Sequence, residues 1–159
     1  MSDPLATYLH DHLAAAQFAV ELLKSLYEQH TREALGEFAA TLLREVEEDR
    51  QTLQRIADQA GTEASLLKEA TAWVGEKVSR FKLRHASAGE SGTLESLETL
   101  VLGILGKQAL WRALSVVAPT NLRVSGEDFE ALAARAQVQH ARVEERRLQV
   151  ARTALRATP

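Results

Sequence analysis

Residues 61–92, GTEASLLKEATAWVGEKVSRFKLRHASAGESG, decide how the rest of the chain is arranged. Apolar residues recur at helical spacing over residues 63–83, and a helix of that length spans about 31 Å at 1.5 Å per residue. The segment that follows, RHASAGESG at residues 84–92, is small and polar and is predicted to be a loop. A helix joined to such a loop can run the length of a helical bundle. We therefore expect residues 61–92 to form a long crossover connection.

Four other segments carry apolar residues at the seven-residue spacing of bundle helices. They predict helices over residues 4–30, 32–60, 93–118 and 126–157. Each predicted helix follows a residue that favours an N-cap, and these residues are Asp3, Thr31, Thr62, Thr93 and Ser125. The first two helices are joined directly and the last two by about seven residues, so each pair is expected to be an antiparallel hairpin.

The composition agrees with a single α-helical domain over residues 1–159. The chain is 45% hydrophobic and only 5% aromatic, with 8 Gly, 3 Pro and no Cys, which favours helices over a β-sandwich. The lack of Cys excludes disulfides and thiolate zinc sites. A net charge of −3 gives no overall attraction to nucleic acid or anionic membranes. No signal peptide and no run of about 18 uncharged apolar residues is found, so a cytoplasmic location is expected.

Two antiparallel helix pairs joined by a long crossover resemble the ferritin-like superfamily. The resemblance implies an all-α, up-down-down-up four-helix bundle, here with an additional helix in the crossover. A simple up-and-down array of five helices is the alternative, but it leaves the loop at residues 84–92 unexplained. Di-iron members of the superfamily carry Glu-x-x-His motifs. None of the five histidines has Glu three residues before it, so no di-iron centre is expected.

Several polar residues interrupt the predicted apolar stripes. Asp49 falls on the series that includes Leu42 and Ile56, and with the turn near Thr31 it lies at about the height of His12. A buried carboxylate needs a partner, and His12 or Arg147 is expected to supply one. The favoured interpretation is a structural hydrogen-bond network that fixes the helix register, formed by His12, Asp49, Gln108, His140 and Arg147.

A metal site is the alternative use of these polar residues. One Fe, Mn or Zn ion would suit N and O donors. The candidate ligands are His12, Glu45, Asp49, His140 and Glu144. No other cofactor is predicted.

Two helices have a second apolar face, formed by Phe18 and Leu22 in one and by Leu110 and Leu114 in the other. The crossover helix could cover this face through Trp73 and Phe81, or a homodimer could form there. Gly103 and Gly106 indicate the close approach of another backbone.

The sequence therefore favours a binding or scaffold protein without enzymatic activity and with an unidentified protein partner. The alternative is a metal-binding protein with redox or oxygen-related activity.

Overall fold

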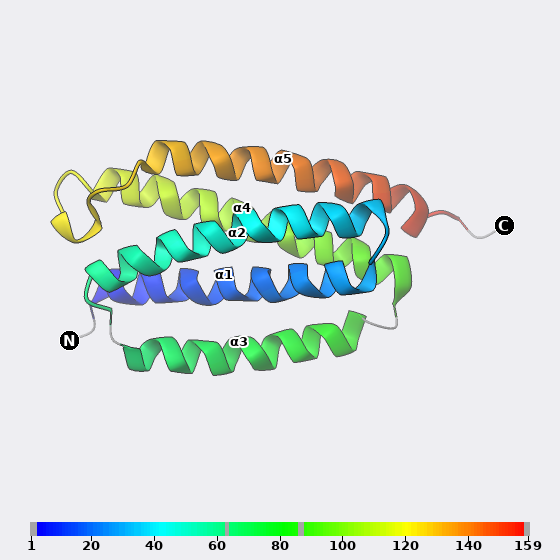
Figure 1. Ribbon diagram of the computed structural model, residues 1–159, viewed down its shortest axis with the longest axis horizontal. Coiled ribbons are helices and arrows are strands. Elements are labelled where there is room, and N and C mark those ends of the chain that lie inside the picture. The colour runs from blue at the N-terminus through cyan, green and yellow to red at the C-terminus, as the bar shows by residue number, and fades with distance from the viewer. Residues whose placement is uncertain (1–2, 63, 86–87, 158–159) are drawn as a thin grey trace.

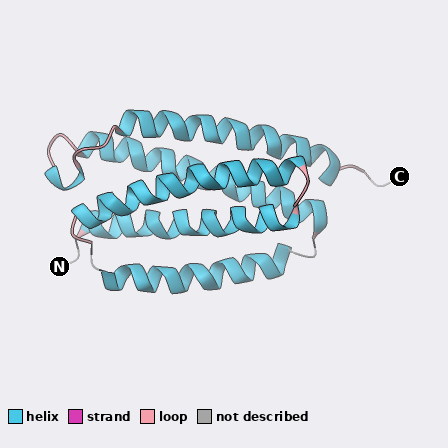
Figure 2. Cartoon of the chain, in the orientation of Figure 1, coloured by secondary structure: helices cyan, strands magenta, loops and turns pink. Residues whose placement is uncertain are grey.

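The computed structural model describes residues 3–62, 64–85 and 88–157. It contains five α-helices and one short 3₁₀ helix, and no strand is found in these ranges (Figure 2). The prediction of an all-α fold is confirmed for this part of the chain. The helices are α1 (Pro4–Gln29), α2 (Ala34–Gln59), α3 (Ala64–His85), α4 (Gly89–Val117), η1 (Leu122–Val124) and α5 (Phe129–Ala154).

Each helix runs opposite to the one before it. Figure 1 shows α1 and α2 as one antiparallel pair and α4 and α5 as another, with α3 lying along the outside of α1. Because α3 carries the chain back along the bundle, α2 and α4 run in the same direction. The apolar core is formed by α1, α2, α4 and α5, and its largest fully buried side chains include Trp111, Leu9, Leu23, Leu42 and Ile56.

The sequence correctly predicted the start of α1 but not the start of α2. Asp3 caps α1 as predicted, since its carboxylate accepts the backbone N–H of Leu5 at 3.1 Å. The predicted cap at Thr31 is wrong: its hydroxyl donates to the carbonyl of Glu28 at 3.1 Å, at the end of α1. Arg32 has a φ of 72°, a left-handed conformation that a right-handed helix cannot include. For this reason α2 begins at residue 34 rather than 32.

The prediction of a loop over residues 84–92 is also wrong, because α3 reaches His85 and α4 begins at Gly89. The His85 ring stacks on Phe81 at 4.0 Å, and its Nδ1 lies 2.8 Å from the Phe81 carbonyl oxygen. Its Nε2 contacts the Glu95 carboxylate of α4. These contacts extend α3 by two residues beyond the predicted end. The predicted cap pair Thr62 and Glu63 cannot be compared, since residue 63 lies outside the described residues.

The connection from α4 to α5 contains η1, which the sequence did not predict. The Arg123 side chain of η1 donates through Nε to the Ala60 carbonyl at 3.0 Å and also contacts the Asp3 carboxylate. Asp128 caps α5 by accepting the N–H of Ala131 at 3.0 Å, so the cap predicted at Ser125 is wrong. Gly126 has a φ of 102°, which prevents the helix from starting at residue 126.

Candidate functional site

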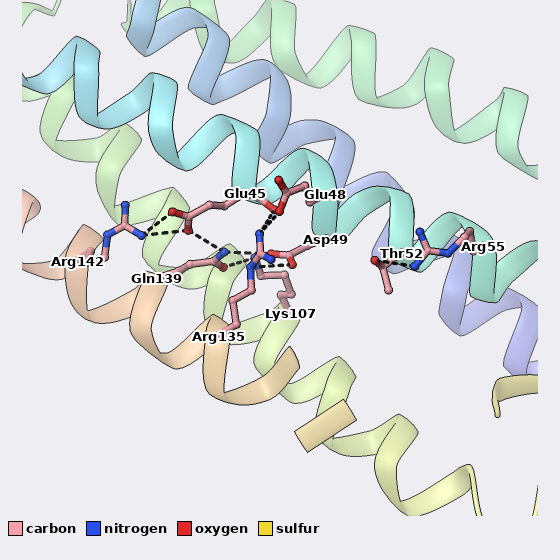
Figure 3. A network of polar contacts seen from close by, with 9 residues as sticks. All are labelled: Glu45, Glu48, Asp49, Thr52, Arg55, Lys107, Arg135, Gln139 and Arg142. Carbon is pink, nitrogen blue, oxygen red and sulfur yellow. Dashed lines mark hydrogen bonds and ion pairs between the residues drawn. The ribbon is translucent and has the colours of Figure 1, made fainter. Parts of the chain in front are cut away.

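A network of charged side chains joins α2, α4 and α5 at the middle of the bundle (Figure 3). At its centre is Asp49 of α2, which is 4% exposed. Its Oδ2 lies 2.6 Å from Lys107 Nζ of α4 and accepts the Gln139 amide of α5 at 3.2 Å. Its Oδ1 lies 3.4 Å from Arg135 Nε of α5. Lys107 also donates to Gln139 Oε1, so three helices meet at this one carboxylate.

The network continues along the interface of α2 and α5. Arg142 donates to both carboxylate oxygens of Glu45, at 2.8 and 3.0 Å, and Gln139 donates to Glu45 at 3.2 Å. Arg135 also reaches Glu48 at 2.7 Å and the Glu45 carbonyl at 3.1 Å. The charges balance, since three carboxylates face three cations: Glu45, Glu48, Asp49, Lys107, Arg135 and Arg142.

Burial and pairing act in opposite directions on the titration of this network. Burial lowers the pKa of Lys107, and the Asp49 carboxylate opposes that shift. Burial would raise the pKa of Glu45, but the hydrogen bonds from Arg142 and Gln139 lead to a net lowering. The carboxylate of Glu45 is therefore stabilised in its charged form by its partners.

A cavity of about 50 Å³ lies beside Asp49 and Lys107, between α1, α2 and α4. Two of its lining residues carry buried N–H groups that have no hydrogen-bond partner in the described part of the chain, namely Trp111 Nε1 and Arg50 Nε. Trp111 is only 1% exposed. Most of the remaining wall is apolar and consists of Ala15, Ala16, Ala19, Val46, Leu53, Leu100, Gly103, Ile104 and Leu110. The cavity has room for more than one water, since about 10–15 Å³ of such space suffices for one.

A larger groove of about 380 Å³ lies on the surface between α1, α3 and α4. Its lining is mostly apolar, and Trp73 stands at its edge, 53% exposed, with Lys77 Nζ 5.5 Å from the ring centre. The groove and the cavity share four lining residues, which are Ala15, Ala19, Leu100 and Gly103. The groove and the cavity therefore adjoin at these residues, three of which have small side chains or none.

Among the described residues of this chain, no other backbone approaches Gly103 or Gly106 of α4 closely, so the close approach that they predict is not made by α3. A Cβ added at Gly103 or Gly106 would meet no other atom within 4 Å. Gly103 is exposed and leaves the space between groove and cavity open.

Asp49 is buried as its spacing predicts, but the partners predicted for it are wrong. They are Lys107, Arg135 and Gln139 rather than His12 or Arg147. His12 lies across the cavity, where its ring contacts Tyr8 at 4.7 Å. Burial lowers the pKa of His12, and Asp11 opposes the shift.

The other predicted members of the network lie elsewhere. Arg147 donates to Glu144 at 2.6 Å and to Glu98 at 3.3 Å, on the outer side of the pair α4 and α5. Gln108 and His140 are half-buried, outside the contacts drawn in Figure 3.

Of the five candidate metal ligands, the structure brings Glu45 and Asp49 together at the Gln139 amide, and it places His140 near Glu144 on α5. His12 lines the cavity, while Glu144 pairs with Arg147. No group of three His, Asp or Glu residues that could hold a metal is found among the described residues.

The second apolar face of α1 is covered by α3, one of the two possibilities stated above. Phe18 packs against Val74, Val78 and Phe81 of α3, and its ring lies 5.8 Å from that of Phe81. Trp73, also expected to cover this face, is half-exposed at the groove. Leu22, Leu110 and Leu114 are buried in the main core. They are therefore not available for a dimer, and the homodimer stays a prediction.

The outer face of α4 is apolar and exposed. Leu102 is 69% exposed and Leu105 is 43% exposed. By length and composition alone α4 could cross a membrane, but it packs on α5 and α1 in the bundle.

Comparison of the chain with family models, curated proteins and solved structures finds no match. The function is therefore argued from the cavity and the network.

Proposed function

We propose that this protein is a non-enzymatic binding protein whose ligand occupies the cavity between α1, α2 and α4. The observation that carries the proposal is a pair of buried donors that find no hydrogen-bond partner among the described residues, Trp111 Nε1–H and Arg50 Nε–H, on two residues that line the cavity. Leaving a buried donor unpaired costs about 1–3 kcal/mol. A ligand that accepts a hydrogen bond from such a donor recovers that free energy.

The charged network supports a structural role beside this site rather than a catalytic one. The Asp49 carboxylate already interacts with Lys107, Arg135 and Gln139. Glu45 is likewise occupied by Arg142 and Gln139. Carboxylates held in this way are poor general bases, because their basic oxygens are already hydrogen-bonded. The network stabilises one wall of the cavity.

In this proposal α1, α2, α4 and α5 form a ferritin-like bundle that lacks a di-iron centre, and α3 belongs to its crossover. Support comes from the course of the chain, since α3 returns along the bundle and leaves α2 and α4 running in the same direction. Helical bundles commonly bind a ligand between their helices, at a site built from side chains of the facing helices.

The test uses the indole N–H signal of Trp111 in an ¹H–¹⁵N spectrum, assigned by comparison with the Trp73→Phe variant. A panel of small acids, alcohols, amines and sugars is added to the full chain. We expect at least one compound to shift the Trp111 indole signal progressively as it is titrated to saturation. The backbone N–H signal of a residue in the cavity wall, such as Ala16, should shift in the same titration. A panel that shifts only the Trp73 signal and other surface signals would overturn the proposal.

A further inference from the structure

We infer that the ligand is an aliphatic monocarboxylate, with its carboxylate inside the cavity at Trp111, Arg50 and Lys107 and its alkyl chain in the groove. This inference rests on the proposed function and names the class of ligand for that site. It follows from the hydrogen-bonding groups of the cavity, its charge, its size and its connection to the groove.

The cavity offers donors in excess of acceptors. Trp111 Nε1–H and Arg50 Nε–H are unpaired. The ammonium group of Lys107 has three hydrogens, of which the described contacts with Asp49 and Gln139 use two. The one carboxylate of the lining, Asp49, already accepts hydrogen bonds from Lys107 and Gln139 and forms an ion pair with Arg135. An acceptor-rich group satisfies this wall, whereas an amine or another donor does not.

Two of the residues that carry donors at the lining, Arg50 and Lys107, are cationic, and hydrogen bonds from a cation to an anion are stronger than neutral ones. Asp49 contributes one negative charge, while Arg50 and Lys107 contribute two positive charges. Glu47, which pairs with Arg50 Nη2 at 3.3 Å, does not line the cavity. His12 adds no charge at neutral pH, since burial lowers its pKa from 6.5 and outweighs the opposing effect of Asp11. Arg50 already pairs with Glu47 and Lys107 with Asp49, so a carboxylate at this wall would gain charge-assisted hydrogen bonds from two cations rather than balance an excess of positive charge.

The size and the walls define the rest of the ligand. The cavity of about 50 Å³ is small for a long ligand, so we expect such a ligand to extend past Ala15, Ala19 and Gly103, which also line the groove. The groove is lined there by Phe18 and Leu22 among other apolar groups. An alkyl chain buries apolar surface in this position, whereas a sugar or a phosphate ester would leave polar groups facing hydrocarbon.

The reverse orientation is less favourable. A carboxylate outside at Lys77, with the chain inside, would leave the donors of Trp111 and Arg50 unpaired. It would also place hydrocarbon against Asp49 and Lys107.

The first experiment compares octanoate, 1-octanol and octylamine by calorimetry on the full chain. These probes share one alkyl length and differ in the head group. We expect octanoate to bind at least tenfold more tightly than octanol, since hydrogen bonds to a charged group contribute more than neutral ones, and octylamine to bind most weakly. The Trp111→Phe variant keeps an aromatic ring but loses the N–H. In this variant we expect octanoate to lose about five- to tenfold in affinity, and octanol to change little.

The second experiment uses two glycines of one helix as a matched pair. Gly103→Leu places a side chain between groove and cavity, whereas Gly106→Leu adds the same side chain outside both linings. Both changes favour the helix, so both variants are expected to fold. We expect octanoate binding to be lost in Gly103→Leu and retained in Gly106→Leu.

Equal binding of octanoate and octanol, or no effect of Trp111→Phe, would overturn the carboxylate inference and leave the proposed function standing. Equal effects of the two glycine variants would overturn the route through the groove, and the inference with it. If none of the three probes binds, the inference is wrong. The Trp111 indole signal under the wider panel then decides separately whether the proposed function fails.

Discussion

Replacing Asp49 with Asn removes the carboxylate at which α2, α4 and α5 meet and leaves its partners in place. Lys107 has only 14% of its side chain exposed and would lose its hydrogen-bonded counter-ion, while burial and the nearby Arg135 guanidinium both disfavour its charged form. Removing one member of a buried ion pair costs about 3–5 kcal/mol, mostly because the remaining charge stays buried. For a domain of this size, about 2–4 °C of melting temperature corresponds to 1 kcal/mol, so we expect Tm to fall by roughly 6–20 °C.

Replacing the other member of the ion pair, as in Lys107→Met, is expected to lower the free energy of unfolding by less. Asp49 would keep Arg135 and the Gln139 amide, and Met retains most of the apolar stem of lysine. We expect a loss of about 1–2 kcal/mol. The double variant should cost less than the sum of the two single variants, because its second change removes a charge that the first left unpaired.

The assay is urea unfolding followed by circular dichroism, with Glu48→Gln as the control. Glu48 belongs to the same network, but its side chain is 65% exposed, so its pair with Arg135 is expected to contribute at most about 1 kcal/mol. If Asp49→Asn costs no more than Glu48→Gln, or if the two single costs simply add, the reasoning about a buried, coupled pair is refuted.

Three further predictions concern pH, backbone and surface. The pKa of Glu45 is lowered in the folded state, because the hydrogen bonds from Arg142 and Gln139 outweigh burial. Its contribution to stability is therefore present above about pH 4.5 and is lost as the pH falls through the lowered value. The Glu45→Gln variant should flatten the acid side of the curve of stability against pH, while the control Glu28→Gln should not. Gly106→Ala should raise stability by up to about 1 kcal/mol, because its added Cβ meets no atom within 4 Å. Gly92→Ala should lower stability, since its added Cβ would lie 2.5 Å from the His85 carbonyl oxygen. Thermal melts that rank the two variants in the other order contradict this prediction. If the chain forms a homodimer through the exposed face of α4, Leu102→Gln with Leu105→Gln should shift its sedimentation coefficient to that of a monomer, and a wild-type chain that is already monomeric rules the dimer out.

The sequence predicted the presence and order of the helices well, because each carries a periodic apolar stripe, but of the predicted N-caps that can be compared only Asp3 is confirmed. It failed where a distant contact determines the end of a helix. His85 is polar and was placed in a loop, yet its stacking on Phe81 and its contact with Glu95 make it the last residue of α3. The turn at Arg32 depends on a left-handed backbone that its residue type does not predict.

The site was predicted only in part, for a related reason. The burial of Asp49 follows from its own helix, but its partners depend on the heights of α4 and α5 relative to α2. Those heights are set by η1 and by the start of α5 at residue 129, and neither was predicted. Gln139 did carry a usable signal, since it lies three residues after Ala136 and four before Val143, both of which are buried. Lys107 carried none, because a lysine in an apolar helix is usually placed in solvent.

The balance of three carboxylates against three cations also limits which substitutions this protein can tolerate during evolution. A substitution at Asp49 alone leaves Lys107 buried without a counter-ion, so it is selected against unless position 107 changes as well. Positions 49 and 107 are therefore expected to vary together among homologous chains, as an acid with a base or as two apolar residues. Positions 45 and 142, joined by two hydrogen bonds at the more exposed end, should drift more freely.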